Sequence, residues 1–181
     1  MTESTRLLLH RLRLRGILGD ASLDAAALEA DGLAQATPAG LMITEAGMAR
    51  AEELIATERA AVDLGAVAAA YERFLAVNRR TKALCARWQQ AGLEVEERFV
   101  LLGELQELTE RVGAALQRTA AQLPRFGSYG PRLEAALETA GLGDGSWIND
   151  PTIDSFHSVW MECHEDYLLV LDRSRELEGS F

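Results

Sequence analysis

PTIDSFHSVWMECHEDY, residues Pro151 to Tyr167, is the stretch from which we predict both the fold and a site. It contains two of the three histidines, one of the three tryptophans and one of the two cysteines, among several carboxylates. Proline suits the first turn of a helix, where its missing N–H has no partner, and an apolar run follows at residues 168–171. The pattern predicts one helix from about Thr152 to Leu177.

One side of this predicted helix combines aromatic, sulfur and imidazole groups. At about 100° per residue, that side carries Asp154, His157, Trp160, Met161, His164 and Leu168. Glu162, Glu165 and Asp166 fall on the flank and the back. The histidines therefore face inward, either as core residues satisfied by a carbonyl group or by Asp154, or as one wall of a ligand pocket.

A metal site is a further alternative for the two histidines, and their spacing disfavours it. His157 and His164 lie ~10.5 Å apart along a helix axis that rises ~1.5 Å per residue. One ion with bonds of ~2.1 Å cannot easily take both side chains. We predict neither a metal nor a cofactor.

Residues elsewhere in the chain could complete such a pocket. Asn78 falls on the apolar face of its own helix, near Phe74 and Lys82, and a buried Asn must be hydrogen-bonded. Arg125 and Arg132, in a turn with two prolines, could clamp a carboxylate or phosphate, or form surface salt bridges with the many glutamates. The residues predicted to line the ligand site are Tyr71, Asn78, Lys82, Trp88, Arg125, Tyr129, Arg132, His157, Trp160 and His164.

General acid–base catalysis is the rival hypothesis for the same pocket. An imidazole of pKa ~6.5 at His157 or His164 could move protons. Glu162 or Asp154 could orient it, and Tyr71 or Tyr129 could act as a donor. The sequence shows no nucleophile elbow, phosphate-binding glycine loop or metal-ligand spacing. Ligand binding is therefore the leading hypothesis, and catalysis is the alternative.

Length and composition bound the class of protein. The chain has 181 residues, a hydrophobic content of 48% and a formal net charge of −10. This acidic balance disfavours nucleic-acid and anionic-membrane surfaces, which need clustered Lys and Arg. Cys85 and Cys163 are expected to be free buried thiols. Because no apolar run approaches the ~20 residues of a membrane span, we expect a soluble, cytoplasmic protein that does not bind membranes.

The first 60 residues predict two helices, a hairpin and a third helix. An amphipathic, arginine-rich helix is expected over residues 5–18, and Ser22 caps a second helix over residues 23–31. A turn at residues 37–40 joins two short apolar runs into a hairpin. Thr44 is the expected N-cap of the helix that follows.

This order of elements resembles a winged-helix domain of the MarR-like regulators. The resemblance is carried by DGL at residues 31–33, which leads into the wing, and by ITEAG at residues 43–47, which closes it. A complete domain of that family has three helices before the wing, and this chain has room for two. The resemblance thus implies a reduced winged-helix-like unit.

The charges of this unit bear on whether it binds DNA. The helix in the reading position offers Asp24, Glu29 and a row of alanines, whereas base edges and phosphates call for basic and amide side chains. Arg11, Arg13 and Arg15 of the first helix are the candidate DNA contacts, and a solvated face explains them equally well. A packing or dimerisation module is the alternative to a DNA-binding one.

From about residue 67 onward the pattern predicts a helical bundle. One of its helices is expected from about Glu94 to Leu123. The inner stripe predicted for that helix is Phe99, Leu102, Leu105, Leu108, Val112 and Leu116.

The same half resembles the helical C-terminal half of a group of actinobacterial winged-helix regulators. The motifs that carry this resemblance are YERF at residues 71–74, LPRF at residues 123–126 and IDSFHSVWMECHED at residues 153–166. It extends over most of residues 67–178 and implies a helical, pocket-bearing domain.

Together these patterns predict a mainly α protein. Residues 1–64 are expected to form the reduced winged-helix-like unit with its small β-hairpin, and residues 65–181 a helical bundle that binds a ligand. The predicted function is that of a small-molecule-binding, transcription-regulator-like homodimer with weak or lost DNA binding. The alternative is a cytosolic enzyme derived from a regulator fold, acting on a small organic or anionic substrate.

Overall fold

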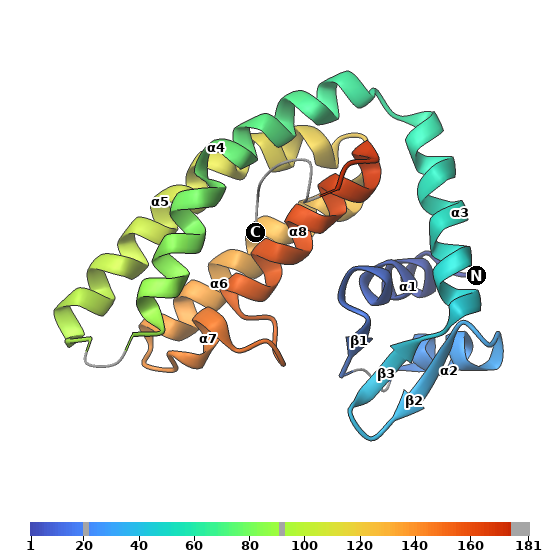
Figure 1. The fold of residues 1–181 in the computed structure, drawn as a ribbon, viewed down its shortest axis with the longest axis horizontal. Coiled ribbons are helices and arrows are strands. Elements are labelled where there is room, and N and C mark those ends of the chain that lie inside the picture. The colour runs from blue at the N-terminus through green and yellow to red at the C-terminus, as the bar shows by residue number, and fades with distance from the viewer. Residues whose placement is uncertain (20–21, 91–92, 175–181) are drawn as a thin grey trace. The chain divides into compact units, whose positions relative to one another are not determined.

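The computed structural model describes residues 1–19, 22–90 and 93–174, and it is mainly α-helical with one small antiparallel sheet (Figure 1). The predicted fold class is therefore confirmed. The described chain divides into two units: residues 62–167 form a helical unit, and residues 1–61 with residues 168–174 form an N-terminal unit. The sequence-based division lies between residues 64 and 65 and assigns the end of the last helix to the helical bundle.

Two helices precede a hairpin in the N-terminal unit. Its elements are α1 (Glu3–Arg15), β1 (Ile17–Leu18), α2 (Leu23–Ala30), β2 (Ala34–Thr37), β3 (Gly40–Ile43) and α3 (Glu45–Ala61). The predicted hairpin is β2 and β3, and β1 pairs with the other edge of β3, which gives the strand order β1-β3-β2. The helix predicted over residues 5–18 is too long, because Gly16, with a φ of 76°, ends α1 and frees the next two residues to pair with β3.

Side-chain caps fix where α2 and α3 begin. The N–H of Ala25 donates to Oγ of Ser22 at 3.3 Å, and the N–H of Gly47 donates to Oγ1 of Thr44 at 3.0 Å, so both predicted caps are confirmed. Gly47 has a second role, because a Cβ there would overlap the carbonyl oxygen of Leu33. The buried core of this unit consists of Leu8, Leu9, Leu12, Leu18, Ala25, Leu28, Ala34, Leu41 and Ala51.

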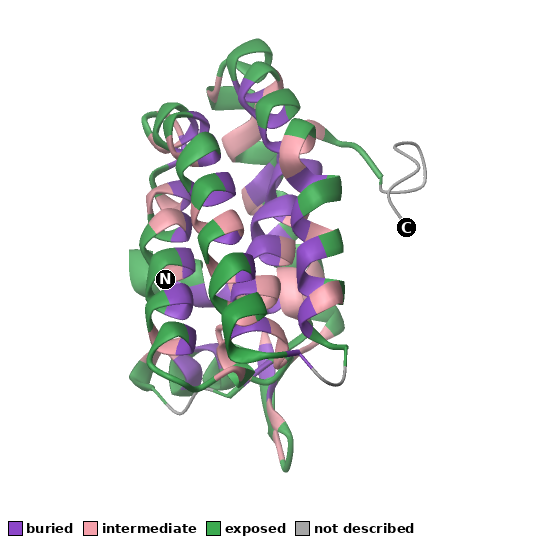
Figure 2. Cartoon of the chain, turned by 90° about the vertical axis from the view of Figure 1, so that its left-hand side faces the viewer, coloured by how far each residue is buried: buried purple, intermediate pink, exposed green. Residues whose placement is uncertain are grey.

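The elements of the helical unit are α4 (Leu64–Trp88), α5 (Val95–Ala120), the 3-10 helix η1 (Pro124–Ser128), α6 (Tyr129–Gly141), α7 (Ser146–Asn149) and α8 (Phe156–Leu171), whose last turn groups with the N-terminal unit. The three longest of these helices are α4, α5 and α8. Helix α5 packs against both α4 and α6, and the short α7 contacts both α4 and α6. Buried and exposed positions form separate stripes along the long helices (Figure 2).

Helix α8 begins four residues later than the predicted start at Thr152. Both the N–H and the hydroxyl of Thr152 donate to Oδ1 of Asp150, at 2.8 and 2.6 Å, which holds this segment in a turn. The N–H of Ser158 then donates to Oγ of Ser155 at 3.3 Å, as at a helix N-cap. Helix α8 ends at Leu171, and the next residue, Asp172, has a φ of 56°. The predicted end at Leu177 lies outside the described residues.

The predicted inner stripe of α5 is wrong at its first position, since Phe99 is 61% exposed. The residues of α5 that are buried are Leu101, Leu105, Leu108, Thr109, Val112, Ala115, Leu116 and Thr119. The predicted stripe is thus confirmed at Leu105, Leu108, Val112 and Leu116, whereas near the start of α5 the buried position is Leu101 and Phe99 lies outside the core.

Candidate functional site

Two inward side chains of α8 form hydrogen bonds with residues of α4. The indole N–H of Trp160 donates to Oδ1 of Asn78 at 2.9 Å, and Nε2 of His164 lies 2.9 Å from the hydroxyl oxygen of Tyr71. All four side chains are buried, and the ring of Phe74 stacks on Trp160 with the centroids 4.5 Å apart. The structure thus brings four of the predicted ligand-site residues together as a packed aromatic core.

The predicted anion clamp holds a carboxylate of the chain itself. Nε and Nη2 of Arg125 bind both oxygens of Asp166 with N···O distances between 2.9 and 3.2 Å. The hydroxyl of Tyr129 donates to the same carboxylate at 2.9 Å. The Asp166 side chain is fully buried and that of Arg125 is 8% exposed, so this is an internal ion pair.

Arg132 makes a second internal clamp beside the first. Its Nη1 and Nη2 donate to the two carboxylate oxygens of Glu162 at 2.7 and 2.9 Å, and its Nε donates to Asp154 at 3.0 Å. Glu162 is only 3% exposed although it lies on the flank of α8. Helix α8 is therefore covered on two sides, by α4 on its histidine side and by η1 and α6 on its carboxylate side.

Burial and nearby charges shift the pKa values of several side chains in this network. Burial and the nearby charges of Asp166 and Glu162 raise the pKa of Tyr129 well above its usual value, and burial likewise raises the pKa of the Cys163 thiol. Burial alone disfavours the charged guanidinium of Arg132, but hydrogen bonds and charge from Glu162 outweigh it and raise its pKa. These groups therefore form a buried network of ion pairs and hydrogen bonds.

The other predicted binding residues are only partly accessible. Lys82 and His157 are half-buried, and each interacts with a neighbour. Among the candidate DNA contacts, Arg11, Arg13 and Arg15 are all half-buried along α1. Nη2 of Arg13 lies 3.6 Å from a carboxylate oxygen of Glu52.

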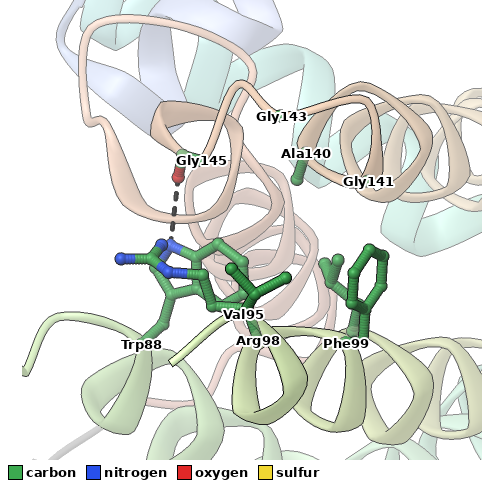
Figure 3. A pocket seen from close by; sticks show the side chains of 9 residues that line it. Trp88, Val95, Arg98, Phe99, Ala140, Gly141, Gly143 and Gly145 are labelled. Carbon is green, nitrogen blue, oxygen red and sulfur yellow. Dashed lines mark hydrogen bonds between the residues drawn. The ribbon is translucent and has the colours of Figure 1, made fainter. Parts of the chain in front are cut away.

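A groove lies elsewhere in the helical unit, between the first half of α5 and the end of α6 (Figure 3). Its volume is about 430 Å³, which falls in the range of small-molecule sites. Its lining residues are Trp88, Val95, Arg98, Phe99, Leu102, Ala140, Gly141, Gly143 and Gly145. A shallower depression of about 580 Å³ continues from it and shares Phe99, Leu102 and Gly141. Of the predicted ligand-site residues, only Trp88 borders the groove.

Trp88 anchors the glycine-rich turn at one end of this groove. Its indole N–H donates to the carbonyl oxygen of Gly145 at 3.1 Å (Figure 3). The guanidinium carbon of Arg98 lies over the indole, 5.0 Å from the ring centroid. A Cβ on Gly145 would lie 3.3 Å from the indole and 3.4 Å from Nη1 of Arg98, so a residue without a side chain permits this close approach.

Sequence reasoning missed Arg98 and misplaced Phe99, although a pattern for this wall is present. Val95, Phe99 and Leu102 are spaced at i, i+4 and i+7, so they form a second apolar stripe beside the buried one. Val95 and Phe99 are each 61% exposed. A helix with two apolar stripes carries more apolar surface than one packed interface covers.

Three general properties of the described residues concern metal-ligand groups, membrane-spanning helices and free thiols. Within the described ranges, no group of three or more His, Cys, Asp or Glu side chains is arranged to hold a metal ion, and no helix is both long and apolar enough to cross a membrane. Cys85 and Cys163 are free and buried, as predicted. Comparisons with family models, with curated proteins and with solved structures find no match to this chain.

Proposed function

We propose that this chain is a small-molecule-binding protein with a regulator-like organisation. In this proposal the helical unit binds a largely apolar ligand in the groove between α5 and α6, and the N-terminal unit binds DNA weakly or not at all. The observation that carries the proposal is the groove itself, with its apolar walls and its volume of about 430 Å³. Large side chains that are as exposed as Val95 and Phe99 on one continuous wall are typical of surfaces that a partner covers.

The composition of the groove favours binding over catalysis. Its deeper part is lined by apolar side chains, glycines and one arginine, with no histidine, cysteine or carboxylate among the lining residues. The enzymatic alternative relies on His157, His164 and Glu162. His164 and Glu162 belong to the buried network, and His157 does not border the groove. The groove thus offers recognition without an evident general acid or base.

The charges on α2 support weak or lost DNA binding. Asp24 accepts hydrogen bonds from the hydroxyls of Ser4 and Thr5, both at 2.6 Å, and these bonds lower its pKa and keep it ionised. Glu29 accepts the N–H of Ala36 at 2.7 Å. An α2 with fixed negative charges and no Lys or Arg would repel phosphates.

Fluorescence anisotropy of labelled duplex DNA at low salt tests this part of the proposal. We expect weak binding or none by the wild-type protein at ~50 mM salt. Salt-sensitive binding that disappears when Arg11, Arg13 and Arg15 are replaced by Glu would show that the N-terminal unit still contacts DNA.

A fluorescent neutral probe tests the groove. N-phenyl-1-naphthylamine is apolar, uncharged and brighter outside water, so we expect saturable binding of one molecule per chain. Gly141→Leu would fill the groove, and a Cβ at this position meets no atom within 4 Å, so the fold should tolerate it. Gly113→Leu is the matched control, because it also has open space around its Cβ and lies away from the groove. Equal binding by the Gly141→Leu variant, or no saturable binding at all, would contradict the proposal.

A further inference from the structure

We propose that the ligand of this groove is a carboxylate with a flat apolar body, and that Arg98 binds its carboxylate group. This inference rests on the proposed function, since it names the class of ligand for the same groove. Among the lining residues that the structure describes, Arg98 is the only charged one in the deeper groove. The chemistry around it decides which polar group a ligand must carry.

Three N–H groups at this end of the groove donate to partners within the chain. The indole N–H of Trp88 donates to Gly145, as described above. In the turn after α6, the N–H of Leu142 donates to the carbonyl oxygen of Glu138, and the N–H of Gly143 to that of Ala140, both at 3.1 Å. Arg98 is the lining residue whose side chain offers several N–H donors to a ligand.

Two carboxylates close to Arg98 along the chain, those of Glu97 and Glu94, have other partners. Glu97 accepts a hydrogen bond from Nη2 of Arg87 at 2.8 Å and another from the backbone N–H of Glu94 at 3.2 Å. The side chain of Glu94 in turn caps the first turn of α5. Within residues 1–19, 22–90 and 93–174, Arg98 forms no salt bridge. A half-buried guanidinium without a carboxylate, in a chain of net charge −10, is well suited to an external anion.

The stacking of Arg98 on Trp88 favours a planar anion. Stacking occupies one face of the guanidinium, while its N–H donors point outward in the plane of the group. Two parallel N–H bonds from this edge match the two oxygens of a carboxylate. A phosphate needs further donors, and the engaged N–H groups of Leu142 and Gly143 do not supply them.

The rest of the groove sets the shape and charge of the ligand body. Phe99 points from α5 toward the end of α6, where Ala140 and Gly141 lie (Figure 3). The glycines of the turn present no side chain, so the space between the two walls suits a flat apolar group. The shallower continuation is bordered by Glu134 and Glu138, which would repel a second anionic group. The expected ligand therefore carries one carboxylate, placed at the Arg98 end.

Competition against N-phenyl-1-naphthylamine tests this inference with a matched pair of probes. We expect 2-naphthoate to displace the fluorescent probe at about one tenth of the concentration that 2-naphthalenemethanol needs, because only the acid pairs with Arg98. Arg98→Gln should weaken 2-naphthoate about tenfold and leave the alcohol and the fluorescent probe unchanged. Arg111→Gln is the control, since this arginine lies on the same helix, is 65% exposed and pairs only with Glu107 across 3.9 Å.

Arg98→Lys keeps the charge without the planar fork, so an intermediate affinity for 2-naphthoate is expected, and circular dichroism checks that both variants fold. Equal displacement by the acid and the alcohol, with the fluorescent probe still bound, would overturn the carboxylate assignment and leave the proposed function intact. Failure of the fluorescent probe to bind would remove both proposals. A third outcome would assign the groove to a second copy of the chain. In that case sedimentation would detect a dimer that Phe99→Ser dissociates, and the fluorescent probe would bind only when dilution separates the two copies.

Discussion

Replacing Asp166 by alanine should destabilise the helical unit more than the loss of an ordinary contact. The change leaves the buried guanidinium of Arg125 without its carboxylate and the hydroxyl of Tyr129 without its acceptor. Removing one partner of a buried ion pair typically costs about 3–5 kcal/mol, and we expect a loss of unfolding free energy in that range. The double variant Arg125→Met/Asp166→Leu replaces the pair by apolar groups, so it should lose less than the sum of the two single changes.

Urea unfolding followed by tryptophan fluorescence measures this effect in the right part of the chain. All three tryptophans, at positions 88, 147 and 160, lie in the helical unit. Glu107→Ala is the control, because its pair with Arg111 is exposed and should change stability by less than about 0.5 kcal/mol. A loss below about 1 kcal/mol for Asp166→Ala, or additive effects in the double variant, would refute the view that this pair is structurally essential.

Three further predictions concern burial. Asn78→Ala leaves the indole N–H of Trp160 unpaired, so it should lower the unfolding free energy by about 2–4 kcal/mol in the same assay, and a loss under about 1 kcal/mol would contradict the assigned bond. Gly47→Ala should destabilise the N-terminal unit by about 1–3 kcal/mol and speed its hydrogen exchange, whereas Gly113→Ala, inside α5 with free space, should stabilise the helical unit by about 0.5–1 kcal/mol. Burial raises the pKa of Cys85 to about 12 from the usual 9.0. Above pH 9 the thiol therefore ionises in the unfolded chain while it stays neutral in the folded chain. The contribution of this burial to the unfolding free energy is fully present below pH 9 and should fall as the pH rises above it. Thiol titration at pH 8 should likewise be slow until urea is added, and immediate reaction of either cysteine would count against this.

The sequence predicted the features of the fold that depend on neighbouring residues. Caps at Ser22 and Thr44 are confirmed because an N-cap needs only a side-chain oxygen and the N–H three residues on. The hairpin is set by its own turn. Strand β1 was missed because its two residues have no strand pattern of their own and are ordered only by the edge that β3 offers.

The predicted site was harder, because periodicity shows which residues face inward and not whether the space between them is filled. Tyr71, Asn78, Trp160 and His164 do converge, as their spacing indicated. The rings of Phe74 and its neighbours occupy the volume where a ligand would otherwise lie. The partner of Arg125 is 41 residues away and that of Arg132 is 30 residues away, distances over which no local pattern assigns ion pairs.

The contrast between the core network and the groove gives the strongest reason to expect a ligand. Arg125 and Arg132 each pair with a carboxylate of α8, whereas Arg98 has no carboxylate partner among the described residues. Two large apolar side chains beside Arg98, Val95 and Phe99, are exposed. Burying a side chain such as Phe99 would stabilise the fold by about 1.5–3 kcal/mol. Because Phe99 is exposed, the folded chain alone lacks this stabilisation. A bound ligand would recover it, and binding only the folded state at 100 times its Kd adds about 2.7 kcal/mol to stability. Because Trp88 lines the groove, the same ligand should change tryptophan emission before any unfolding begins, which separates binding from general stabilisation in one titration.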